Sequence, residues 1–279
     1  RAGETWRACE GILKRIRHLA DASPERNRQY DTVPELDLHY VDPRLVAQYD
    51  TDNAGRHDTD FYLHLATELK ARKVIDLGAG TGVLARDMAA AGREVWAVDP
   101  ATEMLAYARK QPGADRVTWV NADASGIGDW GADLAVMTGN VAQVFLNDDD
   151  WLSTLRHLHA GLRPGGHLAF ESRNPLARAW EEWTPENTRG VTQTPYGPLE
   201  SWLEVQEVRQ GKVRMVGRNV FHETGERLDV PSTLRFRTHQ EITASLEEAE
   251  FKVQEVYGSW LGEPFQSDSR VMIFLARRA

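Results

Sequence analysis

Cysteine, long apolar runs and an excess of positive charge are what this sequence of 279 residues has least of. Cys9 is the only cysteine, so no disulfide can form within the chain and a cysteine-based zinc site is excluded. No apolar run approaches the roughly 18 residues that a membrane span needs. The net charge of −9 argues against a nucleic-acid partner, because such proteins usually present a basic face. We therefore expect a small-molecule partner, no nucleic acid or membrane partner, no metal, and a cytoplasmic location.

One stretch, from Val74 to Gly82, carries the strongest motif in the chain. Its apolar first half, interrupted by Asp76, predicts a buried parallel strand. Its second half alternates glycines, which are required where a backbone turns sharply or lies directly against a ligand. The residues that follow, 83–91, are good helix formers. Strand, glycine bend and helix together indicate the mouth of a nucleotide-binding βαβ unit.

Two further acids follow predicted strands downstream of the glycine bend. Asp99 ends the predicted strand 94–99, where a carboxylate can accept hydrogen bonds from both hydroxyls of a ribose. Asp123 follows the predicted strand 117–120 and could accept a hydrogen bond from the exocyclic amine of adenine. Each acid alone is better explained as a solvated strand end or a helix cap. Acids at three successive strand ends favour a ligand-binding crevice.

With these residues in place, the chain resembles the class I S-adenosylmethionine-dependent methyltransferases of the small-molecule type. Val74–Gly82 matches their first motif, and Asp99 and Asp123 match the acids after their second and third strands. Residues 133–145 resemble their fourth strand and active-site loop, and residues 161–167 resemble the turn before their fifth strand. The resemblance implies an α/β fold: a Rossmann-like, doubly wound, seven-stranded and mostly parallel sheet with an antiparallel last strand.

The resemblance also implies a cofactor, S-adenosyl-L-methionine, with S-adenosyl-L-homocysteine as its product. Asp76 and the bend would hold the methionine end, Asp99 the ribose, and Asp123 the adenine. Met104 could lie against the adenine face, although a core position explains a methionine equally well. The implied cofactor-binding residues are Asp76, Gly78, Ala79, Gly80, Gly82, Asp99, Pro100, Met104, Asp123, Ala124, Thr138 and Gly139.

The dinucleotide-dependent dehydrogenases are the main alternative, since they share the crevice and the ribose acid. Their fingerprint, G-x-G-x-x-G, places the last glycine one residue later than the G-x-G-x-G of this chain. Asp76 lies two residues before the first glycine, where a carboxylate would repel a diphosphate but suits the ammonium group of a methionine moiety. The charge of this residue favours the methyltransferase.

Methyl transfer from a sulfonium is an in-line displacement, so the protein must mainly align the reactants and exclude water. The catalytic candidates are Asn140, in the loop after the fourth strand, and Tyr49, in the segment before the first. A turn residue and a core aromatic are their respective alternatives. Four residues on segments predicted to border the mouth are candidates for acceptor binding: His57, Gln143, Arg173 and Trp202.

Outside the predicted methyltransferase domain (45–175 and 239–279), two segments have their own character. Residues 1–44 predict a helical arm and linker, with an amphipathic helix from Thr5 to Ala20. Residues 176–238 predict an inserted antiparallel meander that serves as a cap or a dimerisation sheet. Its three predicted strands are 200–209, 212–221 and 227–238. A homodimer through this sheet or through the N-terminal helix is one alternative.

The sequence therefore predicts an S-adenosylmethionine-dependent methyltransferase that acts on nitrogen or oxygen of a small molecule. Two other functions stay open at this point. One is an NAD-dependent oxidoreductase, and the other is a module that binds S-adenosylmethionine without transferring its methyl group.

Overall fold

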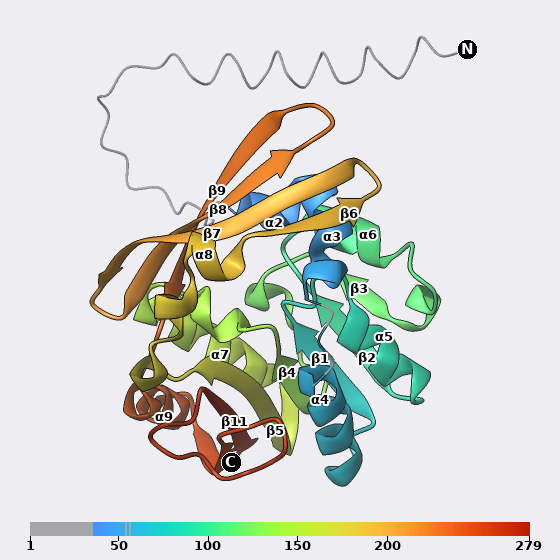
Figure 1. Ribbon diagram of the computed structural model, residues 1–279. Coiled ribbons are helices and arrows are strands. Elements are labelled where there is room, and N and C mark those ends of the chain that lie inside the picture. Colours follow the sequence, from blue (N-terminus) through green and yellow to red (C-terminus); the bar gives the residue numbers. More distant parts are fainter. Residues whose placement is uncertain (1–35, 54, 56) are drawn as a thin grey trace, which may run out of the picture. The chain divides into compact units, whose positions relative to one another are not determined.

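The computed structural model describes residues 36–53, 55 and 57–279, so the predicted helix Thr5–Ala20 lies outside the described residues (Figure 1). Residues 36–279 form one compact unit. It contains a seven-stranded sheet and a separate four-stranded sheet. No helix in the described part of the chain is long and apolar enough to cross a bilayer.

The larger sheet has the strand order β10-β11-β5-β4-β1-β2-β3. Every neighbouring pair is parallel except those of β11, which runs antiparallel to both β10 and β5. This topology confirms the fold class predicted from the sequence. Its strands are β1 (Lys73–Leu77), β2 (Glu94–Val98), β3 (Thr118–Val120), β4 (Ala132–Met137), β5 (Leu162–Arg173), β10 (Phe251–Tyr257) and β11 (Val271–Arg278).

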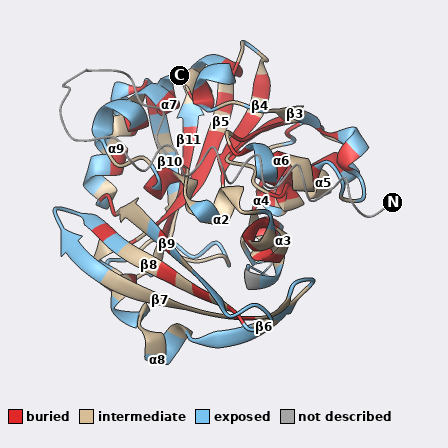
Figure 2. Cartoon of the chain, turned by 90° about the horizontal axis from the view of Figure 1, so that it is seen from above, coloured by how far each residue is buried: buried red, intermediate tan, exposed pale blue. Residues whose placement is uncertain are grey.

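Helices cover both faces of this sheet because its central strands are apolar on both sides (Figure 2). Alternate residues of β1 show the pattern: Ile75 packs in one core cluster with α7 and α9, and Val74 packs in the other with α4 and α5. The helices of the domain are α4 (His57–Glu68), α5 (Val83–Ala90), α6 (Thr102–Ala108), α7 (Asp148–Gly161) and α9 (His239–Glu248).

The second sheet confirms the inserted meander but has one more strand than predicted. β8 (Lys212–Phe221) has the predicted bounds, and β7 and β9 pair with it on either side. The missed strand, β6, is a polar and mostly exposed edge strand, so its sequence carries no alternation of apolar residues. The other bounds are β6 (Gly190–Thr194), β7 (Gly197–Arg209), β9 (Glu226–Arg235) and the short helix α8 (Pro185–Thr188).

The Arg-Pro-Gly-Gly segment, expected as a turn before the fifth strand, is instead part of β5. Leu162 already pairs with Ala132 of β4, and the pairing resumes at His167 after a register shift. Gly165 takes a left-handed conformation, with φ of +76°, inside this irregular stretch. The turn residues therefore form a bulge that lets one strand continue through them.

Two short helices and one loop join the second sheet to the first. The helices α2 (Leu38–Val41) and α3 (Pro43–Asp52) precede the domain, and Arg44 of α3 pairs with Glu226 of β9 at 2.7 Å. On the return path from the sheet, Arg237 is 3% exposed and donates to Asp148 at the start of α7. These contacts hold the second sheet over the loops that follow β4 and β5.

The bend after β1 gives a test of local packing. Gly82 has a φ of +76°, and a Cβ on it would overlap the indole of Trp119. Gly92 has a φ of +85° but open space around it. We expect Gly82→Ala to lower the free energy of unfolding by about 1–3 kcal/mol more than Gly92→Ala, because only the first adds overpacking to backbone strain. Urea denaturation measures both, and equal losses would contradict the described contact.

Candidate functional site

The glycine bend after β1 leaves an open stretch of backbone. Gly78, Gly80 and Gly82 all have positive φ angles, of 75°, 55° and 76°. A Cβ on Gly78 would overlap Val141, whereas one on Gly80 would meet nothing within 4 Å. The middle of the bend can therefore be approached closely by a ligand, while the outer glycines are needed for internal packing.

Asp99, directly after β2, closes over this bend. Its Oδ2 accepts a hydrogen bond from the amide of Gly80 at 2.8 Å, and its Oδ1 accepts one from the amide of Ala101 at 2.8 Å. Burial raises the pKa of this carboxyl, and the two amides oppose that rise. A carboxylate has about four acceptor sites, so Asp99 keeps two for a diol beside the bend.

Asp76 is the buried acid within β1, with only 1% of its surface exposed. Its Oδ1 has no hydrogen-bond partner among the described residues. Burial, reinforced by the charges of Asp99 and Glu171, raises the pKa of Asp76 to about 7. A buried acceptor without a donor is expensive, so this atom marks a place where a cationic donor would be stabilising.

Glu171 on β5 is a site residue that the sequence analysis missed. It is 1% exposed, and its Oε1 accepts from the amide of Asn140 while its Oε2 accepts from the hydroxyl of Tyr62, both at 2.5 Å. Burial raises its pKa to about 7. The available signal was an acid directly after the apolar run 168–170. Tyr62 itself lies in the hydrophobic core, in the cluster that packs between α4, α5 and the sheet.

The loop after β4 is held in an uncommon conformation by Glu171. Gly139 and Asn140 have φ angles of 69° and 64°, and Asn140 is one of few non-glycine residues in the left-handed region. Asparagine tolerates that region better than most residues do. The hydroxyl of Tyr49, from α3, lies 3.9 Å from where a Cβ on Gly139 would stand. The two catalytic candidates thus come together at one loop.

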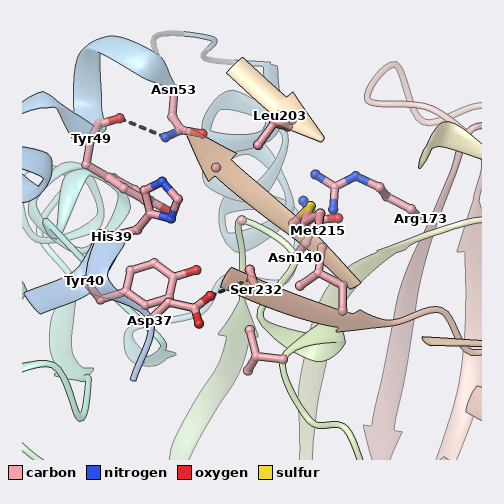
Figure 3. Close-up of a pocket in the computed structure, with 14 residues that line it drawn as sticks. Asp37, His39, Tyr40, Tyr49, Asn53, Asn140, Arg173, Leu203, Met215 and Ser232 are labelled. Carbon is pink, nitrogen blue, oxygen red and sulfur yellow. Dashed lines mark hydrogen bonds between the residues drawn. The ribbon is translucent and has the colours of Figure 1, made fainter. Parts of the chain in front are cut away.

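A cavity of about 200 Å³ opens beyond this loop, between α2, α3 and the second sheet (Figure 3). Polar side chains from the larger sheet's loops and from α2 face apolar side chains from β7, β8 and β9. The lining residues are Asp37, His39, Tyr40, Tyr49, Asn53, Gly139, Asn140, Val144, Arg173, Leu203, Met215, Gly217, Ser232 and Leu234. This cavity is the candidate acceptor site.

Two of the four predicted acceptor residues, Arg173 and Gln143, contact each other, and of the four only Arg173 lines the cavity. Arg173, at the end of β5, lines the cavity and donates from Nη1 to Oε1 of Gln143 at 3.0 Å. Gln143 is fully buried, and its Nε2 donates to the backbone carbonyl of Arg235 on β9. Gln143 thereby fixes the guanidinium in position and connects it to the second sheet.

The other two do not line the cavity. Successive residues of a strand face opposite sides, so Leu203 of β7 points into the cavity and Trp202 points away from it. Trp202 is covered by the guanidinium of Arg189, 3.8 Å from its ring centre. His57 is exposed at the start of α4. His39 and Asp37, which do line the cavity, carried no signal in the sequence because α2 reaches the site only through tertiary packing.

The residues predicted to bind adenine, Met104 and Asp123, differ in how far they are buried. Met104 of α6 is 1% exposed and packs in a small cluster with Val46 and Ala101. Asp123 is exposed and caps its own turn, since its Oδ1 accepts from the amide of Ser125 at 2.8 Å. Its second oxygen has no such contact within the turn, and Ala124 is buried beside it.

Comparison with known proteins agrees with this geometry. Residues 74–166 match the family model described as a methyltransferase domain. The sequence is 36% identical over 114 residues to a malonyl-[acyl-carrier protein] O-methyltransferase of Pectobacterium atrosepticum, covering 39% of this chain and 44% of that protein. It is 28% identical over 222 residues to a cypemycin N-terminal methyltransferase of a Streptomyces species, covering 75% and 84%. The chain spans about half the length of the first curated relatives that it matches.

Among solved structures, an S-adenosylmethionine-dependent methyltransferase from Clostridium acetobutylicum aligns with a TM-score of 0.70 at 16% identity, over 82% of this chain and 95% of that one. The fold is therefore that of the class I S-adenosylmethionine-dependent methyltransferases. The stretch that matches the methyltransferase domain model, residues 74–166, contains the bend, Asp99 and the loop after β4.

The unpaired carboxyl of Asp76 predicts a pH-dependent cost in the cofactor-free protein. Its pKa in the folded state, about 7, is above the ordinary value of 3.8, so the folded protein keeps a proton that the unfolded chain releases. The free energy of unfolding therefore falls as the pH rises from about 4 to about 7. We expect Asp76→Asn to raise the free energy of unfolding, and to do so by on the order of 2 kcal/mol more at pH 8 than at pH 5.

Urea denaturation at the two pH values measures this difference. Asp129→Asn, at an exposed aspartate, is the matched control and should change little at either pH. A gain from Asp76→Asn that is the same at pH 5 and pH 8 would show that the buried carboxyl is not titrating as described.

Proposed function

We propose that this protein is an S-adenosylmethionine-dependent methyltransferase that transfers a methyl group to nitrogen or oxygen of a small-molecule acceptor. The observation that carries the proposal is the unpaired Oδ1 of Asp76 beside the open backbone at Gly80. A buried carboxylate at this place is suited to the ammonium group of an amino acid and unsuited to a diphosphate. The methyltransferase relatives support the same conclusion, and none of the comparisons supports an oxidoreductase.

Residues along the crevice would hold the cofactor from its methionine end to its adenine. Asp76 would accept a hydrogen bond from the ammonium group, and the backbone of Gly80 would lie against the methionine moiety. Asp99 would accept from the ribose hydroxyls with its two remaining lone pairs. Asp123, with the amide of Ala124, would bind the adenine amine. When bound, S-adenosylmethionine supplies an electrophilic methyl group on a sulfonium.

The other predicted residues extend this assignment along the same crevice. Ala79 belongs to the bend, Pro100 follows the ribose acid, and Thr138 begins the loop that would face the methyl group. Met104 would contact adenine only if α6 or its own side chain shifts, because it is packed under α3 in the described structure.

On the acceptor side, the work of the protein is to position and to exclude water. Asn140 and Tyr49 would flank the methyl group, and Glu171 would keep the amide of Asn140 in place through the hydrogen bond described above. An amine or hydroxyl acceptor must lose a proton, and His39 and Asp37 line the same cavity as groups able to take it. The O- and N-methyltransferase relatives keep both acceptor atoms open.

Three further expectations belong to this proposal. The domain boundaries at residues 44, 175 and 239 divide the chain into arm, methyltransferase domain and inserted sheet. A homodimer would form through the inserted sheet or the N-terminal segment. The protein would act in the cytoplasm.

The proposal predicts which cofactor the protein binds and that Asp99 contributes to binding it. S-adenosylmethionine should raise the melting temperature of the protein, whereas NAD should not. Asp99→Ala should weaken S-adenosylmethionine binding by about 1–3 kcal/mol, because the ribose hydroxyls lose a charged acceptor. Calorimetry measures the affinity, with Asp129→Ala as an exposed control that should bind normally.

Unchanged affinity in Asp99→Ala would show that the crevice is wrongly assigned. Stabilisation by NAD alone would favour the oxidoreductase. Tight binding of S-adenosylmethionine without turnover of any acceptor in a broad panel of amines, alcohols and acids would instead indicate a binding module.

A further inference from the structure

Arg173 stands out among the groups that line the acceptor cavity, because it is a permanent positive charge whose contacts are to uncharged groups. Its Nη1 donates to the side-chain amide oxygen of Gln143 at 3.0 Å, and its guanidinium lies 5.2 Å from the ring centre of Trp183. Neither contact neutralises the charge. Arginine does not lose its proton in proteins, so the cavity wall stays cationic at every working pH.

The acid closest to Arg173 along the chain is Glu171, on the same side of β5, and it is already engaged. Both of its oxygens accept hydrogen bonds, one from the amide of Asn140 and one from the hydroxyl of Tyr62. The acid that lines the cavity, Asp37, accepts from the hydroxyl of Ser232 at 2.6 Å. Figure 3 shows Asp37 and Arg173 on different sides of the cavity. Glu171 acts on the guanidinium through its charge, but no hydrogen bond joins the two side chains in the described structure. The donors of Arg173 that Gln143 does not use are therefore left to the cavity.

The rest of the pocket limits what can meet this charge. Leu203, Met215 and Leu234 from the second sheet form the opposing wall, and they offer no polar partner. At about 200 Å³, the cavity is small, so only a small part of a ligand fits inside it. A planar carboxylate matches a guanidinium in two parallel hydrogen bonds, and such pairs are strong where water is scarce.

We propose, on the basis of the methyltransferase function above, that the acceptor is a small carboxylic acid whose carboxylate binds to Arg173. A carboxylate paired with a guanidinium is less nucleophilic, because two of its lone pairs accept hydrogen bonds and its charge is drawn toward the cation. We therefore assign it as the anchor and not as the methylated atom. The methylated nitrogen or oxygen is then a second group of the same molecule, directed toward the loop at Asn140. Gln143 acts as a positioning residue, because it holds the guanidinium through Nη1 and leaves the remaining donors to the acid.

The test compares acids with their amides on protein loaded with S-adenosylhomocysteine. Acetate, lactate and benzoate are titrated beside acetamide, lactamide and benzamide, and binding is followed by ligand-observed NMR. We expect each acid to bind roughly tenfold or more tightly than its amide, because only the acid forms charge-assisted hydrogen bonds with Arg173. Equal binding of acids and amides by the wild-type protein would overturn the proposal, and this comparison needs no variant.

Three variants test whether the preference for acids over amides depends on Arg173. Arg173→Gln should reduce acid binding to the level of the amides, and Arg173→Lys should fall between, since it keeps the charge and loses the planar fork. Arg156→Gln, at an exposed arginine on α7 that pairs with Glu248, is the charge-matched control and should bind acids normally. Full acid preference in folded Arg173→Gln would overturn the proposal. If sulfate bound more tightly than all three acids, that would overturn the assignment to a carboxylate.

Calorimetry with S-adenosylhomocysteine separates this inference from the function on which it rests. Similar affinities in the wild-type protein, Arg173→Gln and Arg156→Gln would show that the cofactor site is intact, so that a lost acid preference reports on the acceptor site alone. No binding of S-adenosylhomocysteine to the wild-type protein would overturn the proposed function. In that case the acid and amide titrations on the free protein would still decide whether Arg173 binds a carboxylate.

Discussion

The buried carboxylates at the carboxyl edge of the larger sheet are the constraint on which the site depends. Asp76, Asp99 and Glu171 come from β1, the end of β2, and β5, and each is almost without solvent. Burial and, after it, neighbouring like charges raise the pKa of a carboxyl, as they do for Asp76. Such a cluster destabilises the fold unless a cation or sufficient donors compensate it. The proposed cofactor would bring both a sulfonium and an ammonium to this edge.

The three acids differ in how far the protein itself satisfies them, and that difference assigns their roles. Glu171 has a donor on each oxygen and holds the loop of Asn140, so it is structural within the site. Asp99 has one amide on each oxygen and keeps capacity for more. Asp76 has an oxygen with no donor at all among the described residues. Under the proposed function, the satisfied acid would have a structural role and the unsatisfied one would bind the cofactor.

The sequence predicted correctly those features that are encoded in short, contiguous stretches of residues. The bend, Asp99 and the strands of the larger sheet are encoded in short stretches with a clear period, and so the fold class was predicted correctly. The edge strand β6 lacks such a period and was missed. Glu171 was missed because its function depends on Tyr62 and Asn140, which are distant in sequence. Trp202 was chosen for its residue type, but the side of the strand that it faces depends on the register of β7.

Helix α3 connects the two halves of the site, and this connection bears on how they would work together. Asp50 near its end accepts a hydrogen bond from Thr81 of the glycine bend at 2.5 Å, while Arg44 near its start pairs with Glu226 of the second sheet. Tyr49 lies between them and reaches the loop at Gly139. A ligand that orders the bend therefore orders the same helix that closes the acceptor cavity. Because the helix is shared, the binding free energies at the two sites should be coupled, and the coupling must be reciprocal.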